Sequence, residues 1–486
     1  MAVGPVASAQ DVTPVQLDSD IVDHDKVDGR RWERFLFDPL ASGVHTIRFS
    51  LDGDADIRFS IFEVSSGNRV ATTYRSATPG TWTGELDASE QYSVGVWAVS
   101  GSASYTATIE PFEPVTPVNS GKDKDKNNDV EETGSGGFDS DEAIFTSART
   151  WNAAGEVHRV LAVGNTLYVG GDFTEIYGPG GKKLKRNYLA AFNRSTGEPT
   201  DFAPELDNNV RALALSPDEK TLYVGGAFIK VDGRSRKRVA AFDVRSGALT
   251  SFDSPGPNSA LRAIVVTDER VYLGGLFTSI GGRDRKHVAA VDPATGALDP
   301  SFIASPGDNV KALVAGPEGL WIGGDFSRVN GVQRRGLGLV DLVDGSLKPS
   351  DDVTAEVIDL AASNDQLFVA VGGPGGRAAA FDRATGKEQW TIASDGNFQA
   401  VDVDTGRYVY FGGHYEIVEG NRDADRMTRH DKRTGKMDVS WLPLVNGIRS
   451  VNAVDVTPDG LYIGGDFSRV DLKPQEGFAI FPGLTR

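Results

Sequence analysis

Several residue types and sequence patterns that would narrow the function of this 486-residue chain are missing or scarce. It has no cysteine, which excludes disulfides and thiolate metal sites. No apolar run approaches the roughly 18 residues that a membrane-spanning helix needs, so no membrane span is predicted. Motifs of the G-x-S-x-G, Walker and dinucleotide-binding types are absent, so we expect no nucleotide cofactor. The six histidines show no metal-ligand spacing: His24, His45, His158, His287, His414 and His430.

The formal net charge of −18 is unevenly distributed along the chain. Residues 11–110 have a net charge of −8, residues 111–143 of −6 and residues 144–486 of only −4. An acidic chain of this kind gives no expectation of nucleic-acid binding. The last part is almost neutral, so its local charge pattern can matter more than the total.

Glycine is abundant, and its placement reveals an internal repeat. A Gly-Gly pair that ends an apolar, aromatic-rich run recurs seven times after residue 144, at spacings of 55, 49, 49, 49, 40 and 52 residues. The pairs end at Gly171, Gly226, Gly275, Gly324, Gly373, Gly413 and Gly465. Each lies in a unit of four short strand-like segments separated by turn signals such as D-x-x-T-G. Such a period and such units are typical of a β-propeller, with one unit per blade.

The ends of the repeat region predict how the ring closes. The last unit stops at 478–481 without a fourth strand, whereas 143–151 looks like a fourth strand without the first three. Together they would complete one blade and leave no open sheet edge. The sequence therefore predicts an all-β chain with a seven-bladed propeller at 143–486. The Gly-Gly pairs and D-x-x-T-G turns have sufficient structural explanations as close approaches and turns.

The front of the chain has a different organisation. Residues 11–112 contain about eight segments that alternate apolar and polar residues, which predicts a small jelly-roll-like β-sandwich domain. Residues 113–142 are acidic, rich in Pro, Gly and Ser and poor in apolar residues, as expected of a flexible linker. Residues 1–10 end near Ala7-Ser8-Ala9, which we interpret as the end of an export signal or as a flexible terminus. The export signal favours a secreted or cell-surface location.

One face of the predicted propeller concentrates basic residues. In this architecture the first strand of each blade lines the channel, and its second residue lies at the mouth. Those residues are His158, Arg211, Arg262, Lys311, Ile358, Gln399 and Asn452. The loops after the second strands add further cations, among them Arg236, Arg285 and Arg335. A basic concave rim would attract an anionic ligand; the alternative is a solvated rim whose cations pair with nearby carboxylates.

The repeats resemble a known class of propeller. The phrases YVGGDFTEIYG (168–178), YVGGAFIKVDGRSRKRVAAFDVRSG (223–247) and YLGGLFTSIGGRDRKHVAAVDPATG (272–296) resemble the delta-60 type repeat of secreted and surface-anchored bacterial proteins. They are also similar to repeats of the fungal cortical cell-polarity markers. The resemblance covers about 144–486 and implies the propeller fold, but it implies no activity because these families share no catalytic motif. The fifth unit departs from the pattern, since its loop is shortened and no Phe follows the glycine pair.

The front domain resembles the pre-peptidase C-terminal type of sandwich found beside secreted bacterial enzymes. Trp32–Phe37, Asp52–Phe62 and Gln91–Trp97 carry this resemblance. Some members bind calcium or polymeric substrates, which implies Asp52, Asp54 and Asp56 as candidate calcium ligands; closely spaced carboxylates suit that cation. The alternative is a surface turn. Trp82 and Trp97 are candidates for a sugar-stacking platform, with sandwich core as the alternative.

Three classes of function remain, and the resemblances do not choose among them. We expect a secreted, non-enzymatic binding or adhesion protein whose propeller mouth holds an anionic polysaccharide or surface polymer. The second is a polysaccharide lyase or glycosidase; a lyase needs a cation and a His or Tyr base, for which His158, Arg211, Arg262, His287 and Tyr415 are available. The third is a protein-binding scaffold. No haem is expected, and no quinone either, because Trp390 alone matches the repeat of quinone-dependent dehydrogenases.

Overall fold

The computed structural model describes the backbone of eight strands before residue 112 and most of the chain after residue 150. The described part of the later region is 151–373, 375–421, 424–439, 441–447, 451–470 and 473–482. The chain divides into two units, residues 1–133 and 134–486, which we describe separately. No helix in the described residues is both long and apolar enough to cross a membrane.

The eight strands of the first unit form two antiparallel four-stranded sheets. One has the order β1-β8-β3-β6 and the other β2-β7-β4-β5. Their bounds are β1 Val15–Ile21, β2 Trp32–Phe37, β3 Gly43–Gly53, β4 Asp56–Glu63, β5 Arg69–Thr73, β6 Gly80–Leu86, β7 Tyr92–Ser100 and β8 Ala103–Pro111. The packing of the two sheets into a sandwich stays a prediction.

The described residues of the second unit contain seven antiparallel repeat sheets of three or four strands, numbered here in chain order, and a small three-stranded sheet of order β13-β12-β9. The all-β prediction is confirmed, since the only helix among them is a single 3₁₀ turn at Pro179–Gly181. The strands are β10 Val157–Val163, β11 Thr166–Gly171 and β14 Leu189–Asn193 (sheet 1); β15 Val210–Leu215, β16 Thr221–Gly226 and β19 Val239–Asp243 (sheet 2); β20 Leu261–Val266, β21 Val271–Gly275 and β24 Val288–Val291 (sheet 3); β25 Val310–Gly316, β26 Gly319–Gly324, β29 Leu337–Val340 and β30 Leu347–Lys348 (sheet 4); β31 Val357–Ala362, β32 Gln366–Val371, β33 Arg377–Asp382 and β34 Glu388–Ala393 (sheet 5); β35 Asn397–Val403, β36 Tyr408–His414 and β37 Met427–Asp431 (sheet 6); β38 Val451–Thr457, β39 Gly460–Gly465 and β42 Phe478–Pro482 (sheet 7).

Short hairpins lie between the second and third strands of five sheets. They are β12 Glu175–Tyr177 with β13 Lys183–Lys185, β17 Lys230–Val231 with β18 Arg234–Ser235, β22 Ser279–Ile280 with β23 Arg283–Asp284, β27 Arg328–Val329 with β28 Val332–Gln333, and β40 Arg469–Val470 with β41 Lys473–Pro474. A further short strand, β9 Asn152–Ala153, pairs with β12.

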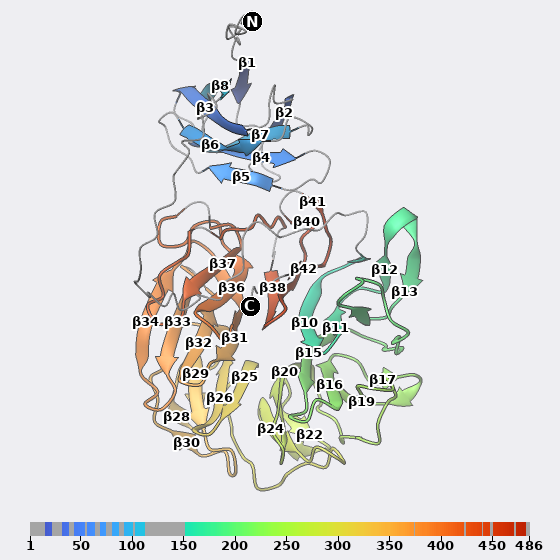
Figure 1. Cartoon of the computed structure of the whole chain (residues 1–486). Coiled ribbons are helices and arrows are strands. Elements are labelled where there is room, and N and C mark those ends of the chain that lie inside the picture. The colour runs from blue at the N-terminus through green and yellow to red at the C-terminus, as the bar shows by residue number, and fades with distance from the viewer. Residues whose placement is uncertain are drawn as a thin grey trace, which may run out of the picture. The chain divides into compact units, whose positions relative to one another are not determined.

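The first strands of the seven sheets, which we call the inner strands, are neighbours in chain order. Contacts run from β10 through β15, β20, β25, β31 and β35 to β38, and β38 lies in turn against β10 (Figure 1). The predicted closing strand at 143–151 lies outside the described residues except for Trp151. That residue and its neighbours contact the last repeat, since Gln475 Nε2 donates to the Trp151 carbonyl at 3.4 Å and Ala153 N to Glu476 O at 3.2 Å.

Every inner strand has a β-bulge at the same place. In sheet 2, Val210 pairs with Gly226 and Ala212 with Gly225, so that Arg211 is the extra residue. The same shift occurs at the second residue of six inner strands and at the third residue of β35, where Gln399 is the extra residue. A bulge leaves one residue out of the ladder and re-aims its side chain. The seven residues that the sequence places at the channel mouth are therefore the seven bulge residues.

The glycine pairs provide the space that this packing needs. A Cβ on Gly226 would lie 2.0 Å from the carbonyl oxygen of Asn209, just before the bulge. A Cβ on the preceding Gly225 would lie 2.8 Å from Ile264 of the next sheet. The first glycine of the last pair, Gly464, meets Val157 of sheet 1 in the same way, at 2.5 Å. In six sheets the pairs thus permit both the bulge and the close approach of adjacent sheets. In sheet 5 the residues opposite the bulge are Ala370 and Val371, and the pair Gly372-Gly373 follows them.

The fourth strand predicted for every unit is wrong for sheets 1, 2, 3 and 6. There the described outer segment forms a single bridge, such as Phe192 with Pro199 in sheet 1. The chain then packs an aromatic residue between two sheets: the half-buried Phe202 ring lies 5.4 Å from the rings of both Tyr168 and Phe242. Burial of a large ring between two sheets outweighs a few more ladder hydrogen bonds at an exposed edge.

Candidate functional site

A pocket of about 360 Å³ lies where the inner strands begin, and all seven bulge residues line it. Its size falls within the range of small-ligand sites. Residues next to the bulges complete the wall. The lining residues are Glu156, His158, Arg159, Asp172, Arg211, Arg262, Lys311, Glu356, Ile358, Asn397, Gln399 and Asn452. We call this the mouth pocket.

The structure separates the nine residues predicted to bind a ligand into two groups. Six line the mouth pocket: His158, Arg211, Arg262, Lys311, Gln399 and Asn452. The three predicted rim residues, Arg236, Arg285 and Arg335, do not.

Two of the rim arginines are tied to the protein's own backbone. Arg236 donates to the Thr250 carbonyl at 3.3 Å, and Arg285 donates to the carbonyls of Asp299 and Pro300, both at 3.2 Å. These bonds fasten the hairpin after the second strand to the segment that leads to the next sheet. Arg335 is exposed.

Most cations of the mouth pocket are paired with carboxylates. Lys311 forms a close ion pair with Glu356, and Arg159 Nη2 lies 3.6 Å from Asp359 Oδ1. Arg211 Nη2 is 4.0 Å from Asp172 Oδ2, and its Nε donates to Asn209 Oδ1 at 3.2 Å. These pairs lower the net positive charge of the pocket below what the sequence suggests.

Arg262 differs from the other pocket cations. Among the described residues its guanidinium makes no hydrogen bond or ion pair, and its Nε is buried without a partner. Burial lowers the pKa of Arg262, and the neighbouring Arg211 lowers it further, while Glu356 acts in the opposite direction. The group remains charged, because arginine holds its proton across the physiological range. Gln399 Oε1 is likewise buried without a partner. Buried polar atoms of this kind call for a ligand or water.

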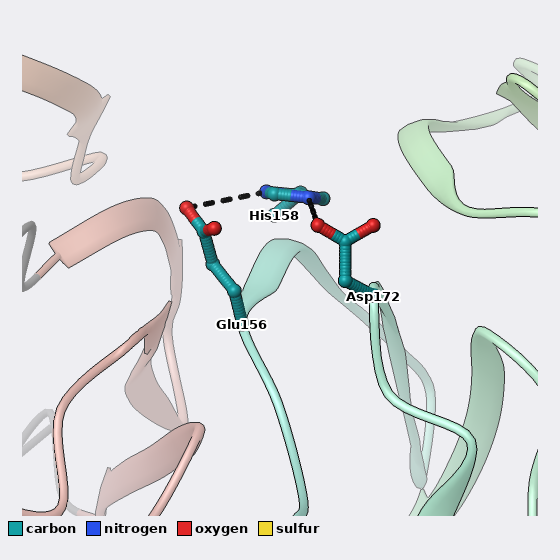
Figure 2. Close-up of side chains that lie close together, drawn as sticks. All are labelled: Glu156, His158 and Asp172. Atoms are coloured by element: carbon teal, nitrogen blue, oxygen red, sulfur yellow. Dashed lines mark hydrogen bonds and ion pairs between the residues drawn. The ribbon is translucent and has the colours of Figure 1, made fainter.

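One wall of the pocket gathers an imidazole and two carboxylates (Figure 2). His158 Nε2 lies 2.8 Å from Asp172 Oδ2, and Nδ1 lies 3.7 Å from Glu156 Oε1. The hydrogen bond from His158 is the main cause that lowers the pKa of Asp172, against the effect of burial. One ligand atom from each of the three residues lies within 4.8 Å of the others, a spacing that could hold a metal ion.

The remaining catalytic candidates are not in this pocket. His287 is buried and lies 3.1 Å through Nδ1 from the Gly275 carbonyl. The Tyr415 hydroxyl is also buried, donates to Phe411 O at 2.7 Å, and has its pKa raised by burial. Only His158, Arg211 and Arg262 of the five lyase candidates share the mouth pocket.

The candidates in the first unit can be placed by backbone only. Asp52 lies at the end of β3 and Asp56 begins β4, whereas Asp54 lies outside the described residues. Trp82 belongs to β6 and Trp97 to β7, which are strands of different sheets. The calcium site and the sugar platform stay predictions. Ala7, Ser8 and Ala9 also lie outside the described residues.

Sequence reasoning missed the acidic residues of the pocket. Glu156 and Glu356 stand two places before a bulge residue, and Asp172 follows a glycine pair. These carboxylates could have been found from the sequence. In each repeat, three positions lie at the mouth: the residue two places before the bulge residue, the bulge residue itself, and the residue after the glycine pair. Comparing all three positions across the repeats shows that the mouth carries both acidic and basic residues.

A second acidic set lies deeper among the inner strands. Asp359 Oδ2 accepts a hydrogen bond from Val401 N at 3.2 Å, which joins sheet 5 to sheet 6. Asp402 Oδ2 accepts one from Val456 N at 2.7 Å, and Asp455 Oδ2 accepts one from Ala162 N at 2.6 Å. These carboxylates therefore link sheets 5, 6, 7 and 1 in succession.

Comparisons with known proteins agree with the repeated-sheet fold. A family described as a "Domain of unknown function (DUF5122) beta-propeller" matches residues 267–302. The fold is that of a β-propeller repeat protein. Among solved structures, the chain is similar to that of U3-55K, with 12% identity over 70% of this chain and 100% of that one and a TM-score of 0.50. It is also similar to the RRP9 WD40 repeats, with 13% identity over 69% and 98% of the two chains and a TM-score of 0.50.

These similarities concern the fold alone, because the identities are low. The family match spans the second and third strands of sheet 3 and the segment that follows them, a small part of the repeat region. A search of curated proteins finds no match. Function has to be argued from the mouth pocket itself.

Proposed function

We propose that this is a secreted or cell-surface binding protein, without catalytic activity of its own, whose mouth pocket holds an anionic group of a polysaccharide or surface polymer. In this proposal the seven sheets are the seven blades of a propeller of the delta-60 type. The first unit is a β-sandwich that adds a second contact on a flexible tether, which would raise the avidity for a polymer.

The observation that carries the proposal is the state of Arg262. It is the one pocket arginine that makes no hydrogen bond or ion pair with the described residues, and it is held beside Arg211 at a cost in desolvation. A carboxylate, sulfate or phosphate would offer oxygen acceptors to its N–H groups and offset the repulsion between the two guanidinium groups. The paired cations Lys311 and Arg211 would surround this anion with a weaker field.

Gln399 supports a ligand that also has hydroxyl groups. Its buried Oε1 lacks a hydrogen-bond donor among the described residues, and it lines the same pocket as Arg262. A sugar hydroxyl can donate to this oxygen. A ligand that combines an anionic group with hydroxyls, as an acidic saccharide does, would meet both needs.

A glycan-array screen of the full chain at two salt concentrations, followed by mass spectrometry of the bound glycans, tests this proposal. We expect binding to acidic glycans that weakens as salt rises, with intact products. Binding confined to neutral glycans, or none to polyanions, would contradict it and leave the protein-binding scaffold as the better proposal.

One arrangement favours a second candidate, a polysaccharide lyase. His158 shares the pocket with Arg211 and Arg262, so a base and two carboxylate-binding cations stand in one cavity. A lyase would release products with a new double bond. Their appearance in the mass spectra, and its loss in His158→Gln, would establish this activity in place of simple binding.

A further inference from the structure

We infer that Glu156, His158 and Asp172 form a binding site for a divalent transition-metal cation, with Zn²⁺ as the best-matched probe. The site lies on the sheet 1 wall of the mouth pocket. The inference does not rest on the proposed glycan ligand, because its residues are distinct from Arg262 and Gln399.

The first argument is the position of the His158 ring between two carboxylates. A neutral imidazole has one N–H, but the ring of His158 faces a carboxylate on each side, Asp172 at 2.8 Å and Glu156 at 3.7 Å (Figure 2). In either tautomer, one ring nitrogen therefore directs a lone pair toward a carboxylate. A cation between them removes that repulsion. A divalent cation bound by all three residues would do so.

The geometry suits a metal ion. The three ligand atoms lie within 4.8 Å of one another, and ligands at about 2.0–2.2 Å from zinc lie at most about 4.4 Å apart. Small rotations of the three side chains would bring their ligand atoms within the spacing that zinc requires. One imidazole with two carboxylates is a ligand set that first-row divalent cations accept, and open positions would face the pocket.

The backbone holds the ligands in place. Asp172 N donates to Glu156 O at 2.8 Å, so the two carboxylate residues are fixed to each other, and His158 is the bulge residue between them. Glu156 also accepts from Asn452 Nδ2 at 2.9 Å, which orients its carboxylate as the outer partners of metal ligands do. The Asp172 side chain is 38% exposed, so a cation can enter from solvent.

No other sheet combines these three residues at the equivalent described positions. Sheet 4 shares one of them: Asp325 follows its glycine pair as Asp172 does, and Asp325 N donates to Asn309 O at 3.0 Å. Its bulge residue, however, is Lys311, a cation that would repel a metal ion. Asp325 therefore provides a matched control.

Titration of the metal-free full chain with Zn²⁺, followed by calorimetry and by equilibrium dialysis with metal analysis, tests the site. We expect His158→Gln and Asp172→Asn each to lower the Zn²⁺ affinity of one site at least tenfold, while Asp325→Asn leaves it unchanged. Comparing variants separates this site from any cation bound by the first unit or by residues 113–142.

Equal Zn²⁺ affinities in the wild-type protein, His158→Gln and Asp172→Asn would overturn the inference. If His158→Gln does not fold, Glu156→Gln takes its place with the same expectation. In the wild-type protein, Zn²⁺ binding at this site without binding of any acidic glycan, or the reverse, shows which of the two proposals fails.

Discussion

Replacing Asp455 by asparagine should change how the stability of the second unit depends on pH. Asp455 lies on β38 and accepts a 2.6 Å hydrogen bond from Ala162 N of β10, the contact that joins the last sheet to the first. Burial raises the pKa of Asp455 from 3.8 to about 6, although the bond from Ala162 and the charge of Arg194 act in the opposite direction. Burial and the charge of Asp455 also raise the pKa of Asp402 well above its usual value.

The sign follows from proton binding. The folded state binds the Asp455 proton more tightly than the unfolded state does, so the favourable contribution is complete below pH 3.8 and is lost as the pH rises through about 6. A shift of this size corresponds to about 3 kcal/mol, at about 1.4 kcal/mol per pKa unit. The asparagine of the Asp455→Asn variant would keep an oxygen acceptor for Ala162 N and would remain neutral at every pH.

Thermal unfolding followed by tryptophan fluorescence measures the effect. For the roughly 340 residues of the second unit, an unfolding entropy of about 2.1 cal/mol/K per residue gives a Tm shift of about 4 °C for 3 kcal/mol. We expect the Tm of Asp455→Asn, relative to the wild type, to be about 4 °C higher at pH 8 than at pH 4. A difference that stays constant with pH, or falls as pH rises, would refute the reasoning.

Asp292→Asn is the matched control for this experiment. Asp292 accepts bonds from the side chain and backbone of Thr295 in an exposed turn, and these bonds lower its pKa. Its ionised form is therefore favoured in the folded state, and that contribution is lost as the pH falls through its folded pKa. The Tm difference for this variant should not change between pH 5 and 8.

Two further substitutions test the structural roles assigned above. Gly226→Ala should destabilise the second unit by about 2 kcal/mol or more, the range typical of overpacking, because its Cβ would meet Asn209 O at 2.0 Å. Chemical denaturation measures this loss of stability. An unchanged denaturation midpoint would contradict the account of the glycine pairs. Arg285→Ala should cost about 1 kcal/mol, a usual value for lost hydrogen bonds, and leave polyanion affinity unchanged. A tenfold loss of that affinity would show that the rim binds ligand after all.

The sequence predicted the repeat architecture and the place of the pocket for a physical reason. Glycine pairs, short apolar strands and turns recur at a regular spacing, and the same position of each unit reaches the mouth. The sequence thus identified His158 and Arg262 as mouth residues. It also predicted a cationic mouth. It missed the ion pairs of Lys311 with Glu356 and of Arg211 with Asp172, because the partners are far apart in the chain.

Other features could not be predicted from local patterns. Arg236 and Arg285 donate to carbonyls 14 or 15 residues away, and a basic loop gives no sign of such bonds. The outer segments of sheets 1, 2, 3 and 6 have strand-like sequences, but Phe202 and its equivalents draw them inward. Tertiary packing decides both outcomes.

The most direct test of the central claim is the affinity of an acidic glycan, chosen from the array, for Arg262→Gln compared with Arg335→Gln. Loss of a charge-assisted contact of about 1.5–3 kcal/mol predicts an affinity about 10- to 100-fold lower for Arg262→Gln. Arg335→Gln removes the same charge from an exposed position outside the mouth pocket and should bind as the wild type does. Equal affinities for the two variants would contradict the proposal that the mouth pocket binds the anion.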